Sequence, residues 1–302
     1  EGPSRFYRFP VLLAEIRRLR ADVLCFVELD CFNEFRDALD AEGYDAVFHQ
    51  RPGKADGCGI FWRREVFCAA APSSTLTFAL PAHDRIAAAQ TLRHHATAQR
   101  LLVVSTHLHW DQQAGHQASE AEELLAFVEA ARTGEAVVIC ADLNATPGSK
   151  AHQVLARRFC DAAGEYAGGA FTSLKPDVYY YAWPRGSQHK PHVELQWHWQ
   201  EGRQEVIDYV FYDAGGLVLE CPAEVPCIDP EPPRKRGRGA TVPYGYWAGG
   251  WAFASSPATG LEDRRKDPTW QPKRLHGELQ LGIPNRLHGS DHLPVVCTLR
   301  LV

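Results

Sequence analysis

The chain has 302 residues, of which 45% are apolar and 23% charged, and its formal net charge at pH 7 is -5. This composition is typical of a globular protein, and the negative charge argues against a protein that coats nucleic acid indiscriminately. It does not exclude a nuclease, because bound metal ions can attract a phosphate to a negative surface. No run of 18 apolar residues occurs, so we expect neither a membrane span nor a membrane partner.

The nine cysteines are scattered and form no CxxC pair, which favours reduced thiols over disulfides or a zinc site. The chain begins at Glu1, contains no Met and shows no signal peptide. We therefore expect a piece of a longer intracellular protein, cytoplasmic or nuclear, whose targeting segment is missing here.

Apolar periodicity predicts helices over residues 8–20, 32–41, 117–132 and 149–158. Apolar runs predict strands over 22–27, 44–48, 58–63, 65–70, 74–79, 86–93, 101–106, 136–141, 206–212 and 293–301. Strands in groups, separated by few helices, favour a layered α/β (α+β) sandwich over regular alternation of strand and helix. The apolar signal spans the chain, which predicts one domain over 1–302, with loop insertions at 175–203 and 222–286.

Acidic and amide side chains stand at the ends of two of these runs. Glu28 follows ADVLCFV, where a carboxylate could face a cleft while its backbone stays in the sheet; the alternative is an ordinary strand-end acid. Asp142 and Asn144 follow VVICA two positions apart, so we expect both on one side of an extended backbone. Such oxygens can bind a hard cation, a water or a phosphate, although an Asx turn that caps the next helix would need only one of the two.

Two further side chains fit phosphate chemistry. His107 ends the strand 101–106 and could donate to a phosphate oxygen, or it could be a half-buried structural histidine; Trp110 follows it closely. Asp208 stands inside an apolar strand, where a charge is unfavourable unless it is paired or bound to a metal. It could orient a catalytic histidine or form a buried salt bridge.

Ser290-Asp291-His292 precedes the last apolar run. His292 is the natural general base, because a carboxylate on its second nitrogen would fix the tautomer and raise basicity. Asp208 is the expected partner of His292, which leaves Asp291 beside the metal or the nucleophile.

The ordered strings RADVLCFVELD, ADGCGIFWRREVF, AAAQTLR, THLHWD, VVICADLNATPGS, VIDYVFY and GSDHLPVV resemble the endonuclease/exonuclease/phosphatase superfamily, in particular its CCR4/nocturnin-like branch. The resemblance implies a four-layer α/β sandwich of two β-sheets flanked by helices, and Mg²⁺-dependent phosphoester hydrolysis, with Mn²⁺ as a substitute. It implies that the metal is bound by Glu28, Asp142 and Asp291. His107, Asn144 and Trp110 would contact the substrate, and His292, Asp208, Asp142, Asn144 and His107 would carry catalysis.

Departures from the family pattern bear on the substrate. Val27 stands where the family usually has Gln, and the first family strand, which supplies an Asn, is expected to be missing. Gln112 and 203–205 replace a Pro and a Phe that lie near the adenine in CCR4-type enzymes. The leading prediction is a 3′–5′ exoribonuclease of poly(A) deadenylase type. A nucleotide phosphatase or 2′,5′-phosphodiesterase, and a non-catalytic scaffold, stay open as alternatives; protein partners are not indicated.

Overall fold

The structure is a computed structural model that describes residues 4–79, 84–111, 115–163, 172–175, 178–182, 196–200, 203–224, 292 and 295–302. The chain divides into two compact units. The larger unit comprises Ile16–Ser173, Glu205–Pro226 and Leu293–Val302, and the smaller unit comprises Glu1–Glu15, Leu174–Gln204 and Cys227–His292. The prediction of one domain over 1–302 stays a prediction.

The first sheet of the larger unit is antiparallel, in the order β1 (Val23–Phe26), β3 (Gly57–Arg63) and β2 (Tyr44–Gln50). The central strand β3 is buried on both faces, as its unbroken apolar run predicts. The first residue of β3 is Gly57. A larger residue would not fit there, because a Cβ would lie 2.1 Å from the carbonyl oxygen of His49. Helix α2 (Phe32–Asp40) buries Phe35, whose ring stacks on that of Phe26 at 5.7 Å.

The second sheet has seven strands. Its order is β4 (Phe67–Ala69), β6 (Ile86–His94), β7 (Arg100–His107), β8 (Ala136–Asp142), β14 (Asp208–Tyr212) and β9 (Cys160–Asp161), while β5 (Ser74–Thr77) pairs with β6. Strands β7 and β8 are parallel, and all other pairs of this sheet are antiparallel. A parallel pair needs a crossover, and α3 (His116–Ala131) supplies it. Strand β8 leads into α4 (Lys150–Ala156).

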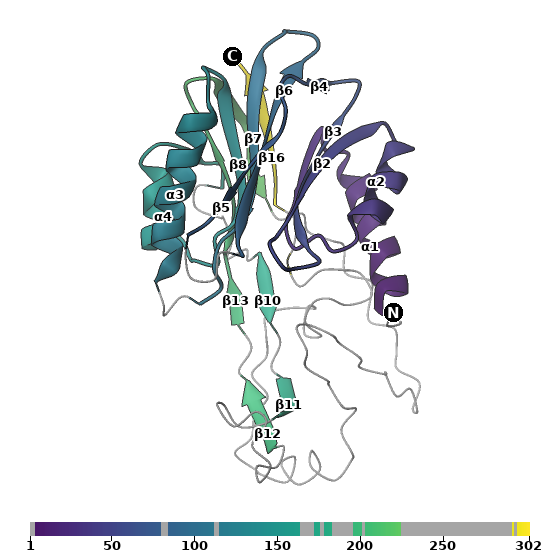
Figure 1. The fold of residues 1–302 in the computed structure, drawn as a ribbon, viewed down its shortest axis with the longest axis vertical. Coiled ribbons are helices and arrows are strands. Elements are labelled where there is room, and N and C mark those ends of the chain that lie inside the picture. Colours follow the sequence, from purple (N-terminus) through teal and green to yellow (C-terminus); the bar gives the residue numbers. More distant parts are fainter. Residues whose placement is uncertain are drawn as a thin grey trace. The chain divides into compact units, whose positions relative to one another are not determined.

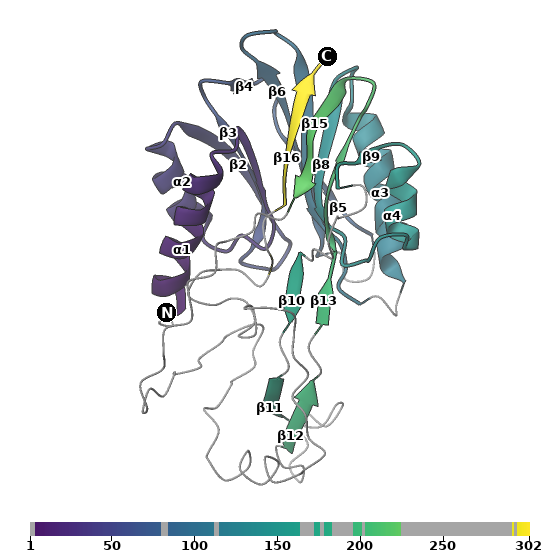
Figure 2. The same cartoon turned by 180° about the vertical axis from the view of Figure 1, so that it is seen from behind.

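Figures 1 and 2 show how these parts of the larger unit are layered: α2, the first sheet, the second sheet, then α3 and α4. One buried cluster fills the space between the two sheets, where Ile60 and Trp62 meet Val103 and Val138. A second lies between the seven-stranded sheet and α3 and α4. The sheets are also joined by a hydrogen bond from Ser105 Oγ to the Phe26 carbonyl, at 3.1 Å. The predicted four-layer α/β sandwich is thus confirmed.

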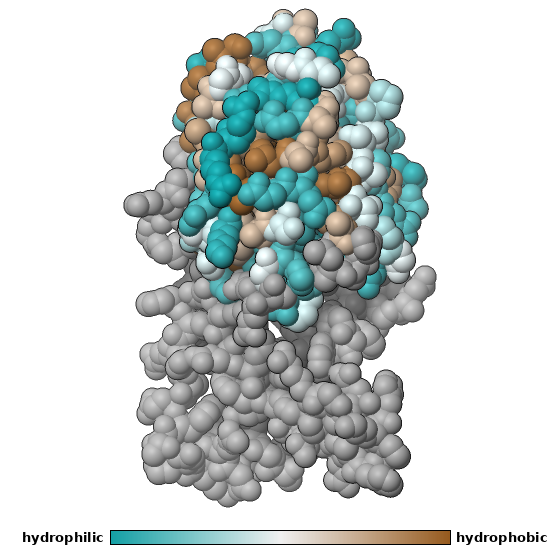
Figure 3. Space-filling view, turned by 60° about the vertical axis from the view of Figure 1, so that its left-hand side comes forward, coloured by the Kyte–Doolittle hydropathy of each residue, from teal (hydrophilic) through white to brown (hydrophobic). Residues whose placement is uncertain are grey.

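The outer faces of α3 and α4 are polar. Arg157 pairs with Glu122 at 3.1 Å, and Arg158 with Glu129 at 2.9 Å. The face of the larger unit turned forward in Figure 3 is mainly hydrophilic around a smaller hydrophobic area. This is the surface expected where amphipathic helices cover a sheet.

Most predicted elements are present with small shifts of their ends, but several strands were missed. The antiparallel pair of β15 (Leu217–Glu224) and β16 (Val296–Leu301) joins the larger unit, and only β16 was predicted. In the smaller unit, β11 (Val178–Ala182) pairs with β12 (Gln196–Gln200). The residues of the paired strands β10 (Ser173–Lys175) and β13 (Arg203–Glu205) are divided between the two units. Strands β11 and β12 lie inside the segment 175–203 that was predicted as a loop insertion, and β10 and β13 lie at its two ends. The predicted insertion at 222–286 lies outside the described residues apart from its first three, which end β15.

Helix α1 (Ser4–Leu19) begins in the smaller unit and ends in the larger one. Among the helices that the structure describes, none has both the length and the apolar character needed to span a bilayer.

Candidate active site

The topology of the seven-stranded sheet brings polar residues together at one end of its central strands. We call this end the strand edge. Because β7 and β8 are parallel, their last residues, His107 and Asp142, are direct neighbours in the register. Strand β14 runs antiparallel to β8, so its first residue, Asp208, pairs with Asp142. Carboxylate oxygens of these two aspartates lie within 4.8 Å of each other. Three positions that are remote in sequence therefore meet at one end of three adjacent strands.

His107 is buried between two carboxylates. Its Nδ1 lies 3.5 Å from Glu28 Oε1, and its Nε2 lies 3.4 Å from Asp142 Oδ2. The amide nitrogen of Asn144 is 2.7 Å from Nε2 and also donates to the Leu108 carbonyl at 3.1 Å. The second bond fixes the amide orientation, so an Asn144 N–H points at Nε2 of His107.

Glu28 lies two residues beyond the end of β1 and has a φ of +51°. The prediction that its backbone stays in the sheet is wrong, because the left-handed conformation turns the chain out of the extended form. The Leu29 N–H then donates to the Gly57 carbonyl at 3.0 Å, which anchors the turn to β3. The Glu28 side chain is 59% exposed, so it can reach a ligand from solvent. Such strain in a residue other than glycine often marks a functional position.

A tight turn after β8 brings the side chains of Asp142 and Asn144 together. Asn144 has a φ of +48°, and its N–H donates to Asp142 Oδ1 at 2.8 Å. The expectation that an extended backbone projects both side chains to one side is therefore wrong; the left-handed residue achieves the convergence. The turn does not cap α4, because Ser149 does so by accepting from the His152 N–H at 3.3 Å.

Asp208 begins β14 instead of lying inside a strand as predicted. Thr172 Oγ1 accepts the N–H groups of Ile207 at 3.0 Å and of Asp208 at 3.1 Å. This buried hydroxyl fixes the start of β14. Thr172 was not predicted, because nothing in its local sequence indicates the contact.

Arg85 is a site residue that the sequence reasoning missed. It precedes β6, which runs antiparallel to β7, so it lies beside His107 at the same edge. Its Nη1 is 3.0 Å from Nδ1 and 3.2 Å from Nε2 of His107, and 3.9 Å from Glu28 Oε1. Burial, and then the charge of Arg51, lower the pKa of Arg85. The available signal was an arginine directly before a mostly apolar strand.

The segment after β7 is held by α3. The His109 N–H donates to Glu120 Oε2 at 2.7 Å, and Gln117 Nε2 donates to the His109 carbonyl at 2.8 Å. Trp110 follows, 60% exposed, with its ring stacked on that of His109 at 5.7 Å. Burial raises the pKa of the enclosed Glu120 to about 7. Burial, and secondly Arg85, lower the pKa of His109.

Asp291 and His292 are the remaining predicted site residues. Asp291 lies outside the described residues. His292 is described, but it belongs to the smaller unit. Their assignments as metal ligand and general base stay predictions.

The donor set fits a hard divalent cation. Glu28, Asp142 and Asp208 offer carboxylates and Asn144 offers an amide oxygen, and such oxygen ligands suit Mg²⁺ and Mn²⁺ better than zinc or copper.

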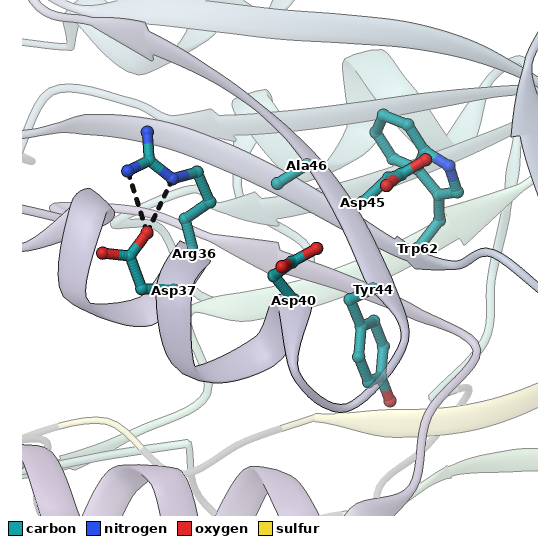
Figure 4. Close-up of a pocket in the computed structure, with 7 residues that line it drawn as sticks. All are labelled: Arg36, Asp37, Asp40, Tyr44, Asp45, Ala46 and Trp62. Carbon is teal, nitrogen blue, oxygen red and sulfur yellow. Dashed lines mark hydrogen bonds and ion pairs between the residues drawn. The ribbon is translucent and has the colours of Figure 1, made fainter.

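A separate hollow lies between α2 and the first sheet (Figure 4). Its lining consists of Arg36, Asp37, Asp40, Tyr44, Asp45, Ala46 and Trp62. Arg36 pairs with Asp37 at 2.8 Å, and Arg64 from outside the hollow pairs with Asp40 at 2.7 Å. None of the predicted site residues lines this hollow, and its charges are those of a solvated surface.

The sequence profile of the endonuclease/exonuclease/phosphatase family matches residues 11–292. "Carbon catabolite repressor protein 4 homolog 6" of Arabidopsis thaliana is 23% identical over 257 residues, which cover 74% of this chain and 33% of that protein. "CCR4-Not complex 3'-5'-exoribonuclease subunit Ccr4" of Yarrowia lipolytica is 24% identical over 271 residues, 70% of this chain and 38% of that protein. "Protein angel homolog 2" of Bos taurus is 31% identical over 160 residues, 47% of this chain and 29% of that protein.

Solved structures share the fold. The human nocturnin catalytic domain with a bound sulfate superposes with a TM-score of 0.61 at 17% identity, covering 98% of this chain and 86% of that one. ANGEL2, a 2′,3′-cyclic phosphatase, in complex with adenosine-2′,3′-vanadate, gives 0.60 at 20% identity, covering 100% of this chain and 88% of that one.

A four-layer sandwich with an acidic, histidine-containing strand edge defines a class of hydrolases that act on phosphoester bonds, generally with a divalent metal. The chain belongs to the endonuclease/exonuclease/phosphatase family. Its relatives fall in the CCR4/nocturnin-like branch, as the sequence resemblance predicted. The chain spans about a third of the length of the curated relatives it matches.

Proposed function

We propose that this protein is a Mg²⁺-dependent phosphodiesterase, a 3′–5′ exoribonuclease of poly(A) deadenylase type. The observation that carries the proposal is the meeting of Glu28, His107, Asp142, Asn144 and Asp208 around one strand edge of a family member. The relative named as a 3'-5'-exoribonuclease subunit supports the choice of RNA and of the 3′ end.

Glu28, Asp142 and Asp291 are the proposed ligands of Mg²⁺, for which Mn²⁺ can substitute; the bound ion supplies Lewis-acid polarisation of the phosphate. Asp142 also orients the attacking water. The Asp142 carboxylate suits both tasks, because its Oδ1 is held by the Asn144 N–H and its Oδ2 faces His107.

Two neutral donors are proposed to stabilise the charge that develops on the phosphate. His107 would donate from its ring on the side of Glu28, and the Asn144 amide, in the turn after β8, would turn one N–H from His107 to the phosphate. Both are fixed in advance by hydrogen bonds, which is the condition for strong transition-state stabilisation. His292 is proposed to take the proton of the attacking water, with Asp208 as the carboxylate that orients it.

Trp110 is proposed to contact the substrate beyond the phosphate. Its ring is exposed beside His109, and both α3 contacts to His109 fix the segment that presents it. A nucleobase at the RNA 3′ end, or in a nucleotide, can stack on such a ring without sequence preference.

A second candidate is a nucleotide phosphatase or a 2′,5′-phosphodiesterase. The proposed contacts are to the phosphate, and the proposed contact to the base is that of Trp110, so the same residues could serve these substrates. The likeness to protein angel homolog 2, at 31% identity over 160 residues, favours including a 2′,3′-cyclic phosphate among the substrates tested. A non-catalytic scaffold on the same fold is the third reading.

A substrate panel in Mg²⁺ separates these proposals: 3′-adenylated RNA, 2′,5′-oligoadenylate, NADP(H) and a 2′,3′-cyclic phosphate end. We expect shortening of the RNA from its 3′ end, and loss of that activity in Glu28→Ala and in His292→Ala with unchanged far-UV circular dichroism. Arg64→Gln, at an exposed ion pair, is the control. Full activity in either site variant contradicts the assignment, and a folded wild-type chain that cleaves nothing in the panel favours the scaffold.

A further inference from the structure

The larger unit contains two buried arginines close to the site, and they differ in how their charge is compensated. Each guanidinium nitrogen of Arg51 donates a hydrogen bond. Nη1 donates to Asp56 Oδ2 at 2.8 Å and Nη2 to Asp84 Oδ2 at 2.9 Å. Nε donates to the Asp84 carbonyl at 2.9 Å. A buried guanidinium needs this, because an uncompensated charge in the interior is strongly unfavourable. Arg51 is therefore explained as a structural residue.

Arg85 is equally buried, yet it lacks this compensation. Both arginines are 8% exposed. Among the residues that the structure describes, Nη1 of Arg85 lies within hydrogen-bonding distance of the ring nitrogens of His107, and the one carboxylate within 4 Å is that of Glu28, at 3.9 Å. Its Nε is buried and has no hydrogen-bond partner among the residues that the structure describes. Buried polar groups nearly always have partners, so an orphaned N–H on a cation indicates a ligand that supplies the acceptor.

The position of Arg85 indicates what that acceptor is. It adjoins His107 and Glu28 at the strand edge where the substrate phosphate is expected. Once Glu28 is engaged with a divalent cation, Arg85 needs another anion. A guanidinium in such a place binds phosphate oxygens through strong, charge-assisted hydrogen bonds.

We propose that Arg85 is the protein's own cationic contact to the substrate phosphate, with its guanidinium donating to a non-bridging oxygen. The inference rests on the proposed function, because it places the scissile phosphate at this edge. Arg85 would then supply a fixed positive charge that does not depend on the metal. This charge favours phosphate groups over neutral ligands, and it can bind inorganic phosphate without the metal.

The test uses Arg85→Met, which removes the charge while keeping much of the apolar stem, and Arg85→Lys, which keeps the charge but loses the planar fork. Arg64→Gln is the matched arginine control outside the site. For each chain we would measure kcat and KM in Mg²⁺, inhibition by inorganic phosphate, and the rise in melting temperature that inorganic phosphate produces in EDTA.

We expect Arg85→Met to lose roughly 10²-fold or more in kcat/KM, the loss seen when one preorganised donor to a developing anion is removed. Inhibition by phosphate should weaken by about tenfold, and the thermal shift in EDTA should disappear. Arg85→Lys should keep part of each effect. Arg64→Gln should behave as wild type. Free guanidinium at sub-denaturing concentration should restore activity to Arg85→Ala, which a purely structural role does not predict.

An unchanged phosphate inhibition constant and an unchanged thermal shift in a folded Arg85→Met or Arg85→Lys chain would overturn the inference. The thermal shift does not depend on turnover. A wild-type chain that hydrolyses nothing but is stabilised by phosphate through Arg85 would therefore contradict the proposed function alone.

Discussion

The two ends of the seven-stranded sheet differ in how their buried charged side chains are paired. At the end opposite the site, Asp213 pairs with Arg132 and accepts from the Gly215 N–H at 3.0 Å. Glu135 pairs there with Arg100 at 2.6 Å and accepts from the Thr133 hydroxyl at 2.9 Å. Each carboxylate is buried and each has its own arginine.

At the site end, a buried histidine stands between two carboxylates, and the buried arginine beside it keeps one N–H without a described partner. The same sheet thus uses internal pairing at one end and retains hydrogen-bonding capacity at the other. Charges that are satisfied internally stabilise the fold, whereas a charge that needs an external partner serves binding. Three predictions can break or sharpen this contrast.

The largest effect should follow from Asp142→Asn at the site end. The substitution keeps an oxygen that can accept the Asn144 N–H, so the turn should persist. It removes the negative charge that the proposed metal site needs, which is worth several kcal/mol of transition-state stabilisation, or roughly 10³-fold in kcat. Steady-state kinetics and urea unfolding would measure both properties. A variant that loses stability but keeps its rate would show that Asp142 is structural.

Asp213→Ala should do the reverse at the opposite end. It leaves Arg132 without its carboxylate at a partly buried position, and breaking such a pair typically destabilises by about 3 kcal/mol. We expect a lower free energy of unfolding in urea, and kcat/KM within about twofold of wild type under folding conditions, since the change is remote from the strand ends that form the site. The exposed variant Arg36→Gln is the control. A large loss of kcat with unchanged stability would contradict the division between the two ends.

The smallest effect concerns Glu120, which clamps the segment after β7. Burial raises the pKa of Glu120 to about 7, from an ordinary value of 4.5. The unfolded chain therefore releases this proton at lower pH than the folded chain does. The contribution of Glu120 to stability is complete below about pH 4.5 and is lost as the pH rises through about 7.

Glu120→Gln cannot ionise and keeps an acceptor for the His109 N–H, so it should remove this loss. At pH 8 it should be more stable than wild type, by up to about 1.4 kcal/mol per unit of the pKa difference. Urea unfolding of both chains between pH 5 and 8 measures the difference, with Glu122→Gln as a control on the same helix. Parallel pH profiles of Glu120→Gln and wild type would show that Glu120 titrates normally.

Prediction from sequence succeeded where the signal is local. Glu28, His107 and Asp142 lie at or just beyond the ends of strands as predicted, because the end of a buried strand is a short-range pattern. It failed for the backbone geometry at Glu28 and Asn144, where the left-handed turns depend on contacts with distant strands. It also failed for β15, whose partner β16 is remote in sequence.

By itself, the sequence determined the layered α/β class, the family and most of the acidic strand ends, since these depend on residue type and spacing. Only the tertiary structure separated Arg85 from Arg51. Both are arginines near the polar end of a strand, and neither differs by local pattern. Their surroundings differ because the fold brings Asp56 and Asp84 to the guanidinium of Arg51. Among the described residues, it brings the His107 ring, with Glu28 at 3.9 Å, to that of Arg85.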